Sequence, residues 1–270
     1  MVFKIVVCIK QVPDTSDIRW TAQNTIQRDG LDSVINPFDI AAIQMANNIK
    51  FVLQRVNCDV EINVVTMGPK QAITAIRTAL AMGCDRGFLL SDKNFSGADT
   101  LATAYTLSQF VKTHMPDFSL IICGQQAIDG DTAQTPSSMA EKLGIAQATN
   151  IVALKEVNPA YSILIKETNE LKQEIKSGYP LLIATILNNV EIIPKINDYI
   201  RAQSNNIELI DAVAIKADFD KIGLKGSPTQ VKKAYKPVIE RNTVLLESKD
   251  INDYAGLIIE KIMQCRNNND

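Results

Sequence analysis

Short apolar runs alternate with amphipathic segments over the first half of the chain. Short apolar runs predict buried parallel strands, and apolar residues at every third or fourth position predict helices. The predicted strands are 3–9, 60–66, 87–90 and 119–123, and the predicted helices are 39–52, 69–82, 98–113 and 137–143. Strands and helices in alternation are typical of an α/β fold with a doubly wound, mostly parallel sheet.

The pattern changes near residue 150. Two strand-like segments, 150–156 and 162–167, flank the turn signal Asn158-Pro159 and predict a hairpin. A further buried strand is predicted at 180–186.

Beyond Asn188 the chain is polar and irregular until an amphipathic helix at 251–263. A helix that follows such a long irregular segment is not expected to belong to the main sheet. We therefore expect one α/β domain over residues 1–231 and a C-terminal arm over 232–270 that packs elsewhere.

Composition and charge exclude several classes of function. Apolar residues make up 46% of the chain and charged residues 21%, as in an ordinary globular protein. A net charge of −2 argues against nucleic-acid binding, which requires a clustered basic excess. Apolar runs are too short to span a membrane, and the run 5–9 is flanked by charges, so we expect neither a membrane span nor a targeting segment.

Five cysteines are scattered along the chain without a CxxC pair. This usage favours a reducing compartment, the cytoplasm, and argues against a thiolate metal site. The only histidine, His114, precedes Met115-Pro116, and a helix end is a better interpretation than a catalytic triad. The chain also lacks a GxxxxGK[ST] loop and a GxGxxG after its first strand. We expect no acid–base catalytic residue and no metal site.

Polar segments follow several predicted strands, at the edge where open α/β sheets bind ligands. Asn36-Pro37-Phe38-Asp39 opens a helix, which Asp39 could simply cap. Gly97-Ala98-Asp99-Thr100 either offers N–H groups to a phosphate or forms a plain cap. Gly226-Ser227-Pro228-Thr229 either cradles a pyrophosphate or is a surface turn.

The most informative segment follows the strand at 119–123 and leads into a helix. It consists of Gly124, Gln125, Gln126, Ala127, Ile128, Asp129, Gly130, Asp131, Thr132, Ala133, Gln134 and Thr135. A turn needs only about four such residues, so this loop carries more polar chemistry than a connection requires. Its carboxylates suit ribose hydroxyls better than a bare phosphate, which favours a nucleotide held by backbone and side chains together.

The motifs of these loops resemble those of one family. VCIKQVPDT at the start, INPFD, TMGPKQA, TALAMGCDRG, GADTLAT, CGQQAIDGDTAQ and GSPTQV occur in this order. Together they are similar to the beta subunit of electron-transferring flavoproteins, and IDGDTAQ after an apolar strand is the specific element.

The resemblance implies a Rossmann-like sheet of the adenine-nucleotide-binding type. In simple members of the family the nucleotide is AMP. In members like those of anaerobic bacteria, GADTLAT and GSPT accompany a second FAD, at which NADH is oxidised and electrons bifurcate. Because this chain carries both segments, the resemblance favours FAD, with AMP as the alternative.

The resemblance also implies the residues of the cofactor site. They are Cys8, Asn36 to Asp39, Thr66 or Met67, Gly124 to Thr135, Gly97 to Thr100 and Gly226 to Thr229, with Asp129 and Gln134 as side-chain contacts. In this chain Thr135-Pro136-Ser137 shifts the proline by one position from the family pattern, at the start of a helix.

The family works as an obligate heterodimer with a larger alpha subunit, and its dehydrogenase partner docks after the strand at 180–186. Relatives are basic there, whereas in 188–206 Lys195 and Arg201 are offset by Glu191 and Asp198.

Two rival functions are considered. An adenylating synthetase requires a glycine–serine pyrophosphate loop after the first strand, where this chain has Lys10-Gln11-Val12-Pro13. A module that only senses AMP has no use for both the GADT and the GSPT loops.

Overall fold

The computed structural model describes residues 2–14, 33–169, 171–187, 192–230 and 250–267. The chain forms two compact units, Met1–Lys233 and Ala234–Asp270. Residues 188–191 of the expected docking segment and 231–249, which include most of the connection to the C-terminal helix, lie outside the described residues.

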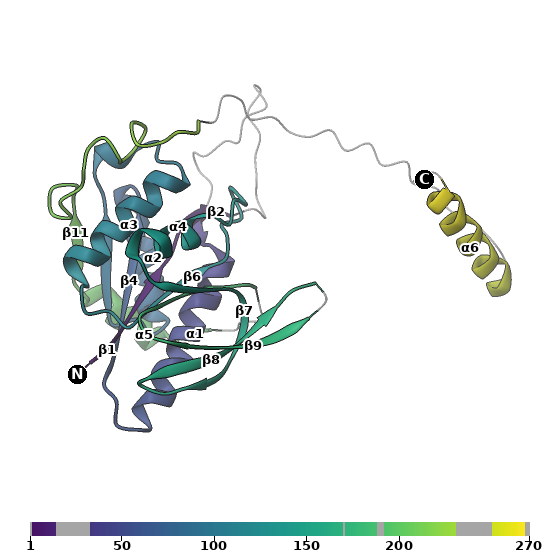
Figure 1. The fold of residues 1–270 in the computed structure, drawn as a ribbon, viewed down its shortest axis with the longest axis horizontal. Helices are drawn as coiled ribbons and strands as arrows, with labels where there is room; N and C mark the ends of the chain where they lie inside the picture. Colours follow the sequence, from purple (N-terminus) through teal and green to yellow (C-terminus); the bar gives the residue numbers. More distant parts are fainter. Residues whose placement is uncertain (1, 15–32, 170, 188–191, 231–249, 268–270) are drawn as a thin grey trace. The chain divides into compact units, whose positions relative to one another are not determined.

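The first unit is built on a nine-stranded sheet with the order β11-β5-β4-β1-β6-β10-β7-β8-β9 (Figure 1). Strands β11 to β7 in this order run parallel, and β8 and β9 are antiparallel additions. The strands are β1 (Phe3–Cys8), β4 (Val60–Met67), β5 (Arg86–Leu90), β6 (Leu120–Gly124), β7 (Ala146–Val157), β8 (Tyr161–Glu167), β9 (Lys172–Gly178), β10 (Leu181–Thr185) and β11 (Ile207–Ile210). A separate pair is formed by β2 (Gln11–Pro13) and β3 (Ser33–Ile35).

Helices cover both faces of this sheet (Figure 1). They are α1 (Pro37–Gln54), α2 (Ile73–Ala81), α3 (Thr100–His114), α4 (Thr135–Leu143) and α5 (Ile196–Ser204), with single 3-10 turns at Lys70–Ala72 and Lys93–Phe95. Apolar side chains of α1, α2 and α5 pack on one face, and those of α3 and α4 pack on the other. Alternate residues of β1 contribute to each core, because side chains of a strand point to opposite faces. The predicted doubly wound α/β fold is confirmed.

The position of β1 defines the ligand-binding edge. The chain leaves β1 through α1 to reach β4 on one side, and later arrives through α3 at β6 on the other side. The order of connections therefore reverses between β1 and β6. Open α/β sheets bind ligands at such a reversal, outside the carboxyl ends of the strands. Cys8 of β1 and Cys123 of β6 stand opposite each other at that end.

Several predicted elements agree with the structure. The hairpin about Asn158-Pro159 is formed by β7 and β8, and the expected strand at 180–186 is β10, which lies between β6 and β7. Helix α4 ends at Gly144, whose φ of 66° is the left-handed conformation that glycine adopts at low cost. The shifted Pro136 lies in the first turn of α4, where a missing N–H removes no helical hydrogen bond.

The prediction of an irregular chain after Asn188 is wrong. Helix α5 and strand β11 follow there, and β11 pairs with β5 as an edge strand of the main sheet. Strand β9 was also missed, because most of its residues are polar and exposed and they show no apolar alternation. The helix expected at 69–82 is a 3-10 turn followed by α2.

The second unit contains α6 (Ile251–Asn267). Its exposed apolar side chains include Ile251, Ile258, Ile259, Ile262 and Met263. In the parts of the chain that the structure describes, no helix is both long and apolar enough to cross a bilayer.

Candidate functional site

Asp39 joins three elements at the carboxyl ends of β1 and β6. Its Oδ2 accepts a hydrogen bond from the backbone N–H of Lys10 at 2.7 Å, and its Oδ1 accepts one from Gly124 at 3.1 Å. The N-cap of α1 is Asn36, so the alternative that Asp39 merely caps this helix is excluded. A Cβ on Gly124 would lie 2.3 Å from Oδ1 of Asp39 and 2.6 Å from Cβ of Phe38, so only glycine permits this close approach.

The charge of Asp39 is sensitive to its surroundings. Burial raises the pKa of this carboxyl to about 7, although hydrogen bonds from the backbone of Lys10, from Asn36 and from the backbone of Gly124 oppose the rise. Near neutral pH the group therefore carries only part of a negative charge. A partly neutral carboxyl at the base of the edge repels a phosphate less than a full carboxylate would.

Asn36 fixes the long loop after β6. Its side-chain amide donates to the carbonyl oxygen of Gln126 at 2.8 Å, and its side-chain oxygen accepts from the N–H of Ile128 at 3.2 Å. The residue is 1% exposed, and its backbone N–H donates to the carbonyl of Lys10 at 2.9 Å. The loop is thereby held against the end of β1 by a buried amide that satisfies two backbone groups.

The side chains of this loop are paired among themselves and with Lys10. Lys10 Nζ lies 2.6 Å from Oδ1 of Asp129, and Gln126 donates to Asp131 at 3.0 Å. Asp131 and Ala133 have φ values of 47° and 52°, which non-glycine residues adopt at a cost of about 1–3 kcal/mol. Such strain is found mainly where function requires a particular backbone.

The loop ends at a helix start without a side-chain cap. Gln134 is the N-cap of α4 and makes no side-chain cap bond. The left-handed Ala133 is followed by Gln134 with φ −97° and ψ −30°. Left- and right-handed residues in succession point their N–H groups to one side, and this geometry binds anions.

The GADT and GSPT loops are joined to each other. Asp99 caps α3 by accepting from the N–H groups of Leu101 and Ala102, and its other oxygen accepts from the N–H and the hydroxyl of Thr229. The N–H of Asp99 donates to Oγ of Ser227 at 2.8 Å. Partial burial disfavours the charged form of Asp99, but the hydrogen bonds from Ala102, Thr229 and Leu101 outweigh burial and lower its pKa.

One contact connects this pair of loops to the loop after β6. The hydroxyl of Thr100 donates to Oε1 of Gln134 at 2.9 Å, so the starts of α3 and α4 lie together. The predicted segments 36–39, 97–100, 124–135 and 226–229 thus form a continuous chain of contacts. Of the side chains expected to bind ligand, Asp129 and Gln134 are engaged by Lys10 and Thr100.

The remaining predicted residues contribute mainly backbone or packing. Cys8 and Thr66 are buried at the ends of β1 and β4, and Met67 packs against the core on the α3 face. Gln125 donates its N–H to the carbonyl of Thr185 at 2.7 Å and accepts from the N–H of Asn150 at 3.1 Å. Its side chain is thus used to join β6 to β7.

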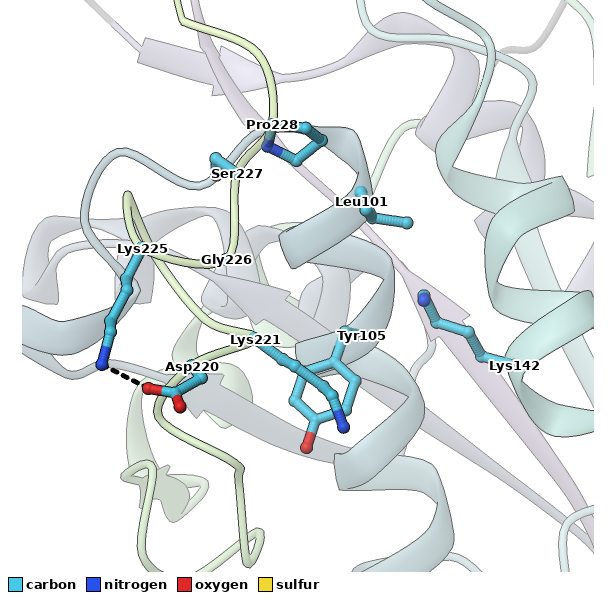
Figure 2. A pocket seen from close by; sticks show the side chains of 9 residues that line it. All are labelled: Leu101, Tyr105, Lys142, Asp220, Lys221, Lys225, Gly226, Ser227 and Pro228. Carbon is cyan, nitrogen blue, oxygen red and sulfur yellow. Dashed lines mark hydrogen bonds and ion pairs between the residues drawn. The ribbon is translucent and has the colours of Figure 1, made fainter.

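A hollow of about 460 Å³ lies between α3, α4 and the segment 220–228 (Figure 2). It is lined by Leu101, Tyr105, Lys142, Asp220, Lys221, Lys225, Gly226, Ser227 and Pro228. Figure 2 shows Lys225 paired with Asp220, and the ammonium of Lys221 lies 5.9 Å from the ring centre of Tyr105. Lys221 is also paired with Asp218, so the positive charge of this wall is largely balanced.

Two residues that sequence reasoning left out belong to this region. Lys10 reaches from the end of β1 to Asp129, and Thr185 accepts the N–H of Gln125 while its hydroxyl lies 3.3 Å from the carbonyl oxygen of Phe38. Lys10 follows the apolar part of β1, which borders the reversal point, and Thr185 ends the apolar run of β10, the next strand beyond β6. That placement is the sequence signal that identifies them.

Comparison with known proteins assigns the family. The sequence pattern described as "Electron transfer flavoprotein domain" matches residues 23–213. The chain belongs to the electron transfer flavoprotein family. It is 37% identical to the electron transfer flavoprotein subunit beta of Megasphaera elsdenii, with 97% of both chains covered. It is 36% identical to Protein FixA of Sinorhizobium fredii, with 96% of this chain and 93% of the relative covered.

A third relative is the acryloyl-CoA reductase electron transfer subunit gamma of Anaerotignum propionicum, 33% identical over 97% of this chain and 98% of the relative. Within the electron transfer flavoprotein family the chain is therefore of the beta-subunit type, which confirms the resemblance seen in the sequence motifs. A beta subunit of this family takes part in electron transfer and has an alpha subunit as its partner.

Proposed function

We propose that the chain binds FAD at the carboxyl ends of β1 and β6 and, with its alpha subunit, transfers electrons from NADH or an acyl-CoA-type dehydrogenase to other acceptors by flavin-based bifurcation. The observation that supports this most is the loop after β6, which Asn36 and Asp39 hold rigidly at the reversal point of the sheet. The residues proposed to hold the cofactor are those of the four joined segments, with the ends of β1 and β4.

The groups at this edge fit an adenine nucleotide. The uncapped start of α4 and the left-handed Ala133 supply N–H groups for a phosphate. Loop carboxylates accept hydrogen bonds from ribose hydroxyls. The redox chemistry is supplied by the flavin when bound, and the chain's own groups bind it, orient it and set the local charge.

The joined GADT and GSPT loops favour FAD over AMP. AMP requires only the adenosine and one phosphate to be held, which segments 36–39 and 124–135 could do without further help. A second phosphate and a flavin ring extend further along the edge. The loops 97–100 and 226–229 lie there, tied together through Asp99 and tied to Gln134 through Thr100. A simple electron carrier with AMP in this site is the second candidate.

Nucleotide content separates these two candidates. We expect the purified heterodimer to contain two FAD and no AMP, and NADH to reduce the flavin. The measurement is extraction and chromatographic quantification of adenine nucleotides per heterodimer. One FAD with one AMP would reject bifurcation and leave the simple carrier, and material without flavin would reject the electron-transfer function.

The docking of a dehydrogenase is proposed at α5. This helix is held against α2, and Arg77 donates to the carbonyl oxygens of Ala202 and Gln203 at its end. Its outer side presents Ile196 and Ile200, which are 79% and 64% exposed. Exposed isoleucines on a helix that is held in place suit an apolar contact with another protein. An apolar contact also agrees with the balanced charges of this segment, which give little electrostatic attraction to a partner.

The double variant Ile196→Ser/Ile200→Ser is expected to raise the KM for the dehydrogenase partner about tenfold, because apolar area buried in the complex is lost. Nucleotide content and heterodimer formation should be unchanged. Val213→Ser is the control, because Val213 is exposed to a similar degree outside α5. Equal effects of both substitutions on the KM would place the docking surface elsewhere.

The compartment is proposed to be the cytoplasm. Cys8, Cys58, Cys84 and Cys123 are all free thiols, and unpaired cysteines are usual where the surroundings are reducing.

A further inference from the structure

Lys10 crosses the reversal point of the sheet. Its backbone is fixed on the β1 side, where the N–H donates to Asp39 and the carbonyl accepts from Asn36. Its side chain leaves that anchor and meets Asp129 in the loop after β6 at 2.6 Å. One residue thus links the two strand ends between which ligands of open α/β sheets bind.

The two anchors of Lys10 differ in strength. The backbone anchor ends on the buried Asp39, whereas the ion pair joins side chains that are 50% and 33% exposed. An ion pair at this exposure contributes only about 0–1 kcal/mol, so the ammonium can turn toward a second anionic partner at little cost.

The negative charge of the loop favours a cation beside a bound phosphate. Asp129 and Asp131 both lie in the loop, and Asp39 lies beneath it. A phosphate that is bound by backbone N–H groups alone would lie beside these carboxylates and be repelled by them. The ammonium of Lys10 offsets one of them, because it lies 2.6 Å from Oδ1 of Asp129.

We propose that Lys10 is the residue that recognises the phosphate of the bound nucleotide, and that Asp129 is a positioning residue for the Lys10 ammonium. This inference rests on the proposed nucleotide site and names the cation that makes that site select a phosphorylated ligand. In the free protein the ammonium is held by Asp129, and in the complex it donates to a phosphate oxygen while Asp129 keeps it oriented.

The role of Lys10 is tested by comparing AMP with adenosine, which differ only in the phosphate. The heterodimer is loaded with its resident nucleotide, and the concentrations of AMP and of adenosine that displace half of it are measured. A general change in the site alters both concentrations by the same factor, so it cancels in the ratio of the AMP value to the adenosine value. Lys10→Met should reduce the preference for AMP about tenfold, and Lys10→Arg should preserve it, since one charge-assisted hydrogen bond is lost or kept.

Lys4→Met is the matched control. Lys4 lies near the start of β1, whereas Lys10 follows its end, and Lys4 forms a 2.7 Å ion pair with Asp117. Lys10→Gln serves as a second neutral variant should the methionine variant assemble poorly. Asp129→Asn distinguishes positioning from ribose binding: it should reduce the affinity for AMP more than that for adenosine.

The possible outcomes are separable. A preference for AMP that is the same in Lys10→Met, Lys10→Gln and Lys4→Met would overturn the role of Lys10. Equal losses of AMP and adenosine affinity in Asp129→Asn would overturn the positioning role. A parent heterodimer that, once its nucleotides are removed, takes up neither FAD nor AMP in this chain would overturn the proposed nucleotide site itself, and the role of Lys10 with it.

Discussion

A chain that ends at Lys249 is expected to fold and to lose its alpha subunit. The truncation removes α6 and leaves intact both apolar cores, which are formed entirely by residues of the first unit. The sheet and its nucleotide edge should therefore persist without the arm. The measurement is the amount of alpha subunit that co-purifies with this chain, together with the mass of the complex by light scattering.

The physical reason lies in the apolar stripe of α6. Ile251, Ile258 and Ile262 follow at spacings of seven and four residues and share one face of the helix. They are 82%, 48% and 60% exposed. Burying a large aliphatic side chain contributes about 1.5–3 kcal/mol, so three of them contribute on the order of 5–9 kcal/mol to a complex. A loss of that size separates a heterodimer at ordinary concentrations.

Point variants test the same face without shortening the chain. Ile258→Lys/Ile262→Lys should weaken assembly as strongly as the truncation does. Glu260→Lys is the control, because Glu260 lies on the opposite side of the helix and contacts Gln264. A truncated chain that still assembles, or equal effects of the face and control variants, would show that the arm does not hold the alpha subunit.

The strands and helices that surround the site could be predicted because burial imposes a pattern on their residues. Strands β1, β4 and β6 are buried on both faces and appear as apolar runs, and α1 has an apolar face that packs on the sheet. Helix α5 has apolar residues at helical spacing, Ile196, Tyr199 and Ile200, but they do not mark its buried side. Ala202 is its buried residue, and its isoleucines are exposed, so the usual relation between apolar residues and burial fails there.

The candidate site was predictable as a set of loops and not as a set of contacts. Polar residues after strands indicate which segments meet at the ligand edge. Which side chain bonds to which backbone group depends on distances between residues far apart in the chain. The bond from the Lys10 N–H to Asp39 and the contact of Thr100 with Gln134 are of this kind. The sequence therefore left open whether Asp39 caps a helix or belongs to the site, and only the structure shows that it joins β1 to β6.

Asn36→Ala is expected to weaken nucleotide binding about a hundredfold. The substitution removes both side-chain bonds of Asn36 and leaves the carbonyl of Gln126 and the N–H of Ile128 without that partner. An unpaired buried backbone group costs about 1–3 kcal/mol, and two of them cost on the order of 3 kcal/mol. The loop can avoid this cost only by moving away from the sheet edge, and it then no longer presents its N–H groups to a ligand.

Asn47→Ala is the matched control for this prediction. Asn47 lies in the middle of α1, away from the ligand-binding edge. Its amide donates to the carbonyl oxygens of Ile43 and Met82. Both substitutions should lower the melting temperature, because each removes two hydrogen bonds to backbone carbonyl or N–H groups. Only Asn36→Ala should also raise the dissociation constant of the nucleotide, measured by calorimetry on the heterodimer. If the two variants bind the nucleotide equally well, the loop after β6 does not hold it.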